Sequence, residues 1–273
     1  MSDGHGQPRG QAALDAPVAV TGDVVGSRRF LAIDRLLAGL DDALAGVEAV
    51  QPAVRPLHRT ERDVFLGIYG DLGSAATAAL RLRLATDDLV LPTVDGVDEP
   101  VELRLGIGID GPTGDAGASA PGGALAPDGT PAPGGRPASD VAVADPVAVA
   151  DPVAVAAERA RRALAEAEEL AVSRTWPDSL RSRCGAGDPV LAAAVNAHLL
   201  LQDQLLARLD ARDRRALLGL LDGERQVDVA HALGVTQPAI ARRLRARGSL
   251  ALHRAVLELT AATRSADSHA GGI

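Results

Sequence analysis

The chain has 273 residues, enough for about two domains, and 47% of them are hydrophobic although only 1% are aromatic. Its net charge of −8 is unlike that of a protein coated with nucleic acid, and its single cysteine excludes an internal disulfide and a cysteine-rich metal site. The first residues lack a signal-peptide pattern, and no apolar run approaches the roughly 20 residues that span a bilayer. We therefore expect a cytoplasmic protein without a membrane partner.

Short β-rich runs alternate with amphipathic helical patterns in the first half of the chain. The spacing of apolar residues predicts helices at 28–50 and 71–84, the second capped by Asp71. β-rich runs predict four strands, of which the middle two form a hairpin: 17–23, 54–59, 63–69 and 101–109. The order strand, helix, strand, strand, helix, strand is that of a ferredoxin-like unit, an antiparallel sheet with helices on one face.

The second half begins with a segment that cannot form a core. Residues 111–144 are almost entirely Gly, Pro, Ala, Ser and Asp, so we expect a low-complexity loop over 111–150. The hexapeptide DPVAVA then occurs twice in tandem, and its second copy begins a helix with Asp151 as the cap and Pro152 in the first turn.

Glycine and proline near residue 180 suggest a boundary between two domains. The chain becomes loop-like over 176–188, and five helical patterns follow it. The predicted organisation is a disordered N-terminus, an α+β domain, a linker, an all-helical domain and a disordered tail: 1–15, 16–175, 176–188, 189–263 and 264–273.

Within the helical domain, the spacing of residues 226–247 predicts two short helices joined by a tight turn. Gly234 falls where the first helix reverses direction, a position that favours a left-handed backbone. Apolar side chains on both sides of the turn are spaced to face one small core: Val229, Leu233, Val235, Ile240 and Leu244. This is the pattern of a helix-turn-helix, whose second helix enters the DNA major groove.

The second helix of the pair carries the candidate DNA contacts. All 28 basic residues of the chain are Arg, so arginine abundance alone means little, but between residues 210 and 254 nine Arg face five acids. Gln237 and Arg242 are expected to read bases from a face that also holds Pro238 and Ala241. Phosphate contacts are expected from Thr236, Arg225, Arg243, Arg245 and Arg247.

These residues predict a transcriptional regulator that binds double-stranded DNA and needs no cofactor. We expect a homodimer, because one recognition helix covers too few base pairs for useful specificity. Two alternatives use the same residues: a bundle that docks another protein, and a charged helix face that is merely solvated.

Four segments of the chain resemble the SatD family of bacterial proteins. They occur in the family order and read TGDVVGSR, DVFLG, LRLGIGI and DPVAVAAERARRAL, at 21–28, 63–67, 103–109 and 151–164. The family sequence GDEFQG appears here as RDVFLG at 62–67. The resemblance implies an N-terminal fold similar to the catalytic core of nucleotide cyclases, and the helix pair is similar to region 4 of sigma factors.

That resemblance supplies an alternative function for two acidic residues. Asp23, which ends the first strand, and Asp63, at the hairpin, would converge and could hold Mg²⁺ with a nucleotide. Ser27 and Arg28, at a helix start, are candidates for the phosphate. Paired acids alone rarely suffice for catalysis, and the chain has no GGDEF-type signature, so a sensing or oligomerisation domain is the favoured interpretation over an enzyme.

Two further patterns are not interpreted as sites. Gly106, Gly108 and Gly111 spell GxGxxG, but Pro112 and the low-complexity loop follow where a dinucleotide site needs a helix. Cys184 has no base nearby in the sequence and is expected to be an inert thiol.

Overall fold

The computed structural model describes residues 16–86, 88–111 and 151–270, and side chains as far as residue 262. The segment 1–15 and all but the first residue of the expected loop 111–150 lie outside this range. The described chain is a mixed α+β structure built on one five-stranded sheet, with a separate two-stranded hairpin of β4 (Val90–Pro92) and β5 (Asp98–Pro100).

The main sheet has the strand order β2-β3-β1-β6-β7. Its bounds are β1 (Val18–Val24), β2 (Arg55–Arg59), β3 (Phe65–Tyr69), β6 (Leu103–Ile109) and β7 (Ser182–Ala186). Strand β1 pairs antiparallel with both β3 and β6, and β7 joins the edge parallel to β6. The four predicted strands are confirmed, but the prediction missed β7, so the sheet is mixed and not purely antiparallel.

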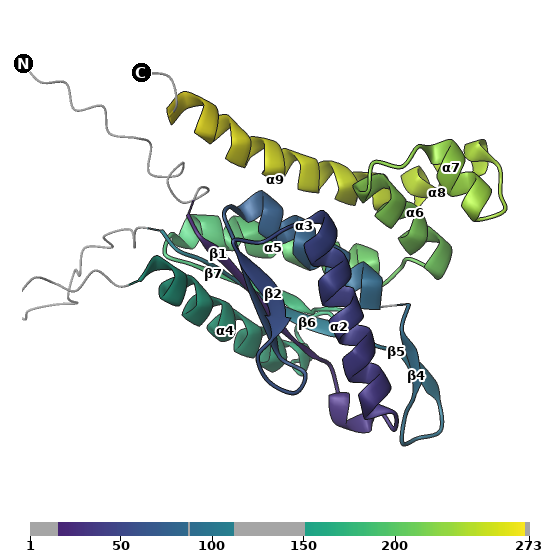
Figure 1. Cartoon of the computed structure of the whole chain (residues 1–273), viewed down its shortest axis with the longest axis horizontal. Helices are drawn as coiled ribbons and strands as arrows, with labels where there is room; N and C mark the ends of the chain where they lie inside the picture. The colour runs from purple at the N-terminus through teal and green to yellow at the C-terminus, as the bar shows by residue number, and fades with distance from the viewer. Residues whose placement is uncertain (1–15, 87, 112–150, 271–273) are drawn as a thin grey trace, which may run out of the picture.

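Helices cover both faces of this sheet (Figure 1), whereas the sequence predicted helices on one face. On one side α2 (Ile33–Val50), α3 (Leu72–Thr86) and α5 (Pro189–Leu206) enclose the main core, and α4 (Pro152–Ala171) lies on the other side. Side chains alternate along β1 to fill both faces: Val18, Val20 and Val24 toward the main core, Ala19 toward α4. Helix α4 is the crossover between the parallel strands β6 and β7, and it lies opposite α2 and α3.

The glycines of β6 let α4 lie directly on the strand. A Cβ atom added to Gly106 would stand 2.0 Å from the carbonyl oxygen of Ala160, and one added to Gly108 would stand 1.9 Å from that of Ala156. No side chain fits between the two backbones. The GxG pattern therefore serves close helix–sheet packing, in agreement with its exclusion as a dinucleotide motif.

The segment 176–188 is not a linker, because it contains β7. Cys184 is buried on this strand, and the side-chain amide of Asn196 on α5 accepts from its N–H at 2.8 Å and donates to its C=O at 2.9 Å. Gly185, which suggested a loop, lies beneath α4, where an added Cβ would stand 3.0 Å from the Arg159 carbonyl oxygen. The glycine-rich sequence thus reflects tight packing of a covered edge strand.

Four helices complete the chain: α6 (Ala211–Leu221), α7 (Gln226–Ala232), α8 (Gln237–Ala246) and α9 (Ser249–Ala270). Leucines of α3 share a second core with α5, α6 and α9, so the helical part packs against the sheet part: Leu80, Leu84, Leu206, Leu209, Leu217, Leu252 and Val256. Helix α9 continues through most of the predicted tail 264–273, because no Gly or Pro interrupts it before Gly271. None of the described helices combines the length and apolar character that crossing a membrane requires.

Candidate nucleic-acid interface

Helices α7 and α8 pack around a small core with the arrangement that the sequence predicted. Val229, Ile240 and Leu244 are buried, and Leu233 and Val235 pack against them with Ala216 of α6 and Leu250 of α9. Gly234 adopts a left-handed conformation with φ of 64°, and the Val235 N–H donates to the carbonyl oxygen of Ala230 at 3.0 Å. The turn is therefore fixed by the glycine conformation and by its own hydrogen bonds.

Thr236 and Pro238 begin the second helix. Thr236 is the N-cap residue in an extended conformation, and its carbonyl oxygen accepts from the N–H of Ala239 at 3.0 Å and of Ile240 at 3.1 Å. Its hydroxyl makes no capping bond. Pro238 occupies the first turn, where its missing N–H costs no helical hydrogen bond. The Thr236 hydroxyl is thus left exposed at the end of α8 that carries the positive helix dipole.

One face of α8 carries the candidate base-reading side chains. Gln237, Pro238, Arg242 and Arg245 are exposed, and Ala241 is partly buried between them. Among the described residues, neither arginine of this face has an ion-pair or hydrogen-bond partner. Gln237 donates from Nε2 to Oε1 of Gln226, at the start of α7, across 3.1 Å. The two glutamines therefore link the exposed ends of both helices.

Arg243 is engaged inside the protein. Its Nε donates to Oδ1 of Asp213 at 2.8 Å and its Nη2 donates to Oδ2 of Asp210 at 2.5 Å, both at the start of α6. The hydrogen bond to Asp213, and to a lesser extent the one to Asp210, raises the pKa of Arg243. This contact holds α8 against α6. Its acidic partners lie about 30 residues earlier, so the helix spacing gave no indication of it.

Two other arginines predicted to contact phosphate also have acidic neighbours. Arg225 donates from Nε to Asp228 at 2.8 Å on the surface of α7. The Nε of Arg247 stands 3.8 Å from Asp213, in a loose contact, and its side chain is about half exposed. Contact with DNA would require Arg225 to exchange an existing partner, whereas Arg242 and Arg245 need no exchange.

The alternative site around Asp23 lies on the sheet face that carries α4. A cavity of about 340 Å³ opens there, with six polar residues in its lining: Thr21, Asp23, Thr60, Glu61, Arg161 and Glu168. Burial raises the pKa of Asp23, the guanidinium of Arg104 opposes that rise, and the negative charges of Glu168 and Asp63 add to it. Asp63 acts on Asp23 only as a neighbouring negative charge and does not line the cavity, so the two carboxylates are not shown to share a binding site.

These residues do not fit a metal ion. Arg104 donates from Nη1 to Oδ2 of Asp23 at 3.3 Å, so a positive charge already stands beside this carboxylate. The described part of the chain contains no cluster of three or more His, Cys, Asp or Glu arranged around a metal. Ser27 and Arg28 belong to the three-residue 3-10 helix η1 (Ser27–Arg29), outside the lining of this cavity, and so do not face it.

No protein-family model and no curated protein matches the chain. Among solved structures, the FimX GGDEF domain of Pseudomonas aeruginosa aligns with 37% of this chain at 21% identity and a TM-score of 0.26. The alignment spans 66% of that domain, just under two thirds of its length. At this TM-score the likeness does not establish a common fold.

Proposed function

We propose that the chain binds duplex DNA through α8 and acts as a transcriptional regulator. The proposal rests on one observation: one face of α8 is packed against the protein, and another face carries exposed polar side chains. Ile240, Leu244 and Arg243 hold the helix on its neighbours, while Arg242 and Arg245 extend from another face without partners among the described residues. A helix anchored on one side with cationic and amide side chains on the other suits a major groove.

Each exposed group has a role that its chemistry suggests. Arg242 can donate two hydrogen bonds to the O6 and N7 acceptors of guanine, and Gln237 can pair with the N6 and N7 edge of adenine. The contact with Gln226 orients the Gln237 amide at the helix start. Thr236, Arg245 and Arg247 would bind phosphates and set the register, whereas Arg243 is reserved for holding α8 in place.

For the N-terminal half we infer a ferredoxin-like unit similar to a nucleotide-cyclase core. The order β2-β3-β1-β6, with α2 and α3 on one face, supports this interpretation. Such a domain would serve sensing or oligomerisation. A homodimer would place two copies of α8 on neighbouring half-sites and so supply the specificity that one helix lacks.

Selection from a random duplex pool, followed by binding assays, tests the proposal. We expect enrichment of one sequence and an affinity that falls with salt. Arg242→Ala should cost roughly 1–3 kcal/mol and relax one base position, while Arg245→Ala should weaken binding to all sequences and reduce the salt slope by about one. Arg174→Ala is the matched control, because Arg174 is exposed, lacks a described partner and lies outside this helix pair.

The competing interpretation of the same face is a protein-docking surface. It predicts that the pool enriches no sequence and that any DNA binding depends little on salt. Equal effects of Arg242→Ala and Arg174→Ala on DNA affinity would likewise remove α8 as the recognition helix.

The cavity at Asp23 favours a second candidate function, nucleotide sensing. Its volume lies in the range of small-molecule sites, and Arg161 could bind a phosphate by exchanging its contact with Glu158 at 3.2 Å, which would also offset the acids of the lining. Nucleoside triphosphates, with and without Mg²⁺, should then raise the melting temperature, and Asp23→Asn should alter that shift. The absence of any melting shift would remove both the sensing and the cyclase-like interpretation.

A further inference from the structure

Helix α5 lies at an edge of the sheet, where it packs on β7, the last strand in the order. Its inner face is buried in the main core through Val195 and Leu199. Its outer face is open: Val190 is 76% exposed and Leu201 is 65% exposed. Two large aliphatic side chains of one helix therefore stand in solvent.

The outer face of α5 carries no charge. Between Asp188 and Asp203 the sequence contains no acidic or basic residue apart from the half-buried His198. The exposed residues of this stretch are all apolar: Pro189, Val190, Ala193, Ala194, Ala197 and Leu201. A helix that is apolar on every face is normally buried in a protein. Helix α5 thus has the composition of a buried helix, although one of its faces meets solvent.

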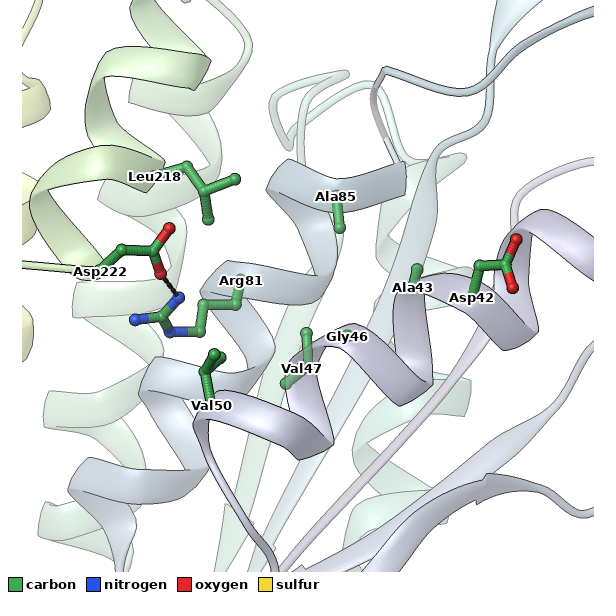
Figure 2. A pocket seen from close by; sticks show the side chains of 9 residues that line it. All are labelled: Asp42, Ala43, Gly46, Val47, Val50, Arg81, Ala85, Leu218 and Asp222. Atoms are coloured by element: carbon green, nitrogen blue, oxygen red, sulfur yellow. Dashed lines mark hydrogen bonds and ion pairs between the residues drawn. The ribbon is translucent and has the colours of Figure 1, made fainter. Parts of the chain in front are cut away.

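The helices α2 and α4, which also cover the sheet, place charges where they meet solvent. Figure 2 shows this on α2, where Ala43 and Val47 line a cavity against α3 and α6 while the exposed Asp42 lies at the end far from Asp222. The exposed charged residues of these two helices are Asp34, Arg35, Asp41, Asp42, Glu158, Arg161, Arg162, Glu168 and Glu169. The uncharged face of α5 is therefore not a general property of this arginine-rich and alanine-rich chain.

Four residues of this face have the spacing of a helix-pairing seam. Val190, Ala194, Ala197 and Leu201 follow one another at intervals of four, three and four residues, which is the spacing of the a and d positions in a heptad. Alanine at the two central positions lets a second helix approach closely. We call these four residues the α5 seam.

The α5 seam is complementary to itself. Ala194 and Ala197 are equally far from its middle, and so are Val190 and Leu201. In an antiparallel pair of α5 helices, Val190 of one copy would meet Leu201 of the other, and Ala194 would meet Ala197. Reciprocal contacts of this kind are what a two-fold symmetric interface requires.

Charges beyond the two ends of the seam favour the antiparallel orientation. Asp188 caps the N-terminal end of α5. Arg208 follows the C-terminal end, where it is exposed and has no ion pair with any described residue. Antiparallel pairing brings these opposite charges to the same end of the interface, whereas parallel pairing would bring like charges together.

We propose that α5 pairs with α5 of a second copy of this chain, in an antiparallel and two-fold symmetric dimer. The pairing would remove Val190 and Leu201 from water and leave no charge buried between the helices. The proposal does not depend on DNA binding, although such a dimer would supply the two recognition helices that paired half-sites need.

Sedimentation equilibrium of the full chain without DNA tests the dimer. We expect the average mass to rise from that of one chain to that of two as the concentration increases about a hundredfold. Ala197→Arg should raise the dissociation constant about tenfold or more, because each dimer would then hold two guanidinium groups without partners in the seam. Ala45→Arg, at an exposed position of α2, is the matched control and should leave the constant unchanged. Circular dichroism melting checks that both variants are folded.

A mixture of two variants tests the antiparallel register. Ala194→Glu alone should weaken the dimer, as Ala197→Arg does. Because position 194 of one copy would face position 197 of the other, mixing the two variants places opposite charges together. The mixed dimer should form about tenfold or more tightly than the dimer of either variant alone.

Three results would overturn the proposal: the mass of one chain at every concentration, equal dissociation constants for folded Ala197→Arg and Ala45→Arg, or no gain on mixing. DNA binding is measured separately. A chain that dimerises through α5 but binds no DNA would contradict the proposed function alone, and a monomer that binds DNA would contradict the dimer alone.

Discussion

Arg243 of α8 donates from Nε to Oδ1 of Asp213 on α6 across 2.8 Å, and the Asp213 side chain is only 1% exposed. Asp213 also belongs to the capping box of α6, in which Asp210 accepts from its N–H at 2.9 Å. One guanidinium thus joins α8 to the start of the neighbouring helix α6. Arg242, the preceding residue, is exposed to solvent instead. Adjacent arginines of one helix therefore lie in different environments.

This contrast predicts opposite outcomes for two neighbouring substitutions. Arg243→Ala should lower the free energy of unfolding by roughly 1–3 kcal/mol, because it leaves a buried carboxylate without its main partner. Arg242→Ala should change it by less than about 0.5 kcal/mol, as is usual at an exposed position. Urea denaturation followed by circular dichroism measures both. Equal losses for the two variants would contradict the assigned role of Arg243.

The helix pair was predictable because its signals are local. The intervals between Val229, Ile240 and Leu244, and the glycine between them, are set by helix period and turn geometry within about 20 residues. The partner of Arg243 was not predictable in this way. Its acids lie on another helix, and only tertiary packing of α6 against α8 brings them within hydrogen-bond distance.

The local sequence likewise could not predict that β7 is a strand of the sheet. Its sequence SRCGA has little β-rich character, so local propensity indicated a loop. What makes it a strand is parallel pairing with β6 and cover from α4 and α5, none of which the local sequence shows. Similarly, Asp23 and Asp63 could be proposed as neighbours from strand order, but the guanidinium of Arg104 beside Asp23 comes from the adjacent strand β6.

The packing of α4 on β6 predicts a large cost for one methyl group. Gly108→Ala should destabilise the protein by roughly 1–3 kcal/mol or more, since its Cβ would overlap the Ala156 carbonyl oxygen and α4 would have to move. Gly46→Ala is the control, because its Cβ meets open space and alanine favours a helix over glycine by about 1 kcal/mol. Denaturant unfolding should shift in opposite directions for the two variants, and a stable Gly108→Ala protein would contradict the close contact.

The environment of Asp23 predicts a pH-dependent stability difference. Burial raises the pKa of its carboxyl above the ordinary value of 3.8, so the folded chain holds this proton more tightly than the unfolded chain. Its contribution to stability is therefore fully present below pH 3.8 and decreases as pH rises through the raised value. Asp23→Asn cannot ionise, so its stability relative to the wild type should increase with pH over that window. Urea unfolding at several pH values measures the difference.

Asp41 supplies a control of the opposite sign. Hydrogen bonds from Arg59 lower the pKa of Asp41 below 3.8, so the stabilisation it gives is present above pH 3.8 and is lost as pH falls through the lowered value. Asp41→Asn should therefore lose stability relative to the wild type as pH rises in the acidic range. Curves with the same sign for both variants would contradict the raised pKa of Asp23.

The rate at which the Cys184 thiol is labelled tests whether its segment is a buried strand or an open linker in solution. Burial raises the pKa of its thiol to about 12, and only the thiolate reacts with iodoacetamide. At pH 8 the native chain should therefore be labelled far more slowly than the chain in urea, and a single cysteine makes the rate unambiguous.

Asn196→Ala removes both hydrogen bonds that hold the outer edge of β7, worth about 1 kcal/mol each. Local opening of the strand should then become easier, and labelling about tenfold faster or more. Rapid labelling of the native wild type, unaffected by Asn196→Ala, would mean that this segment is open to solvent as a linker would be.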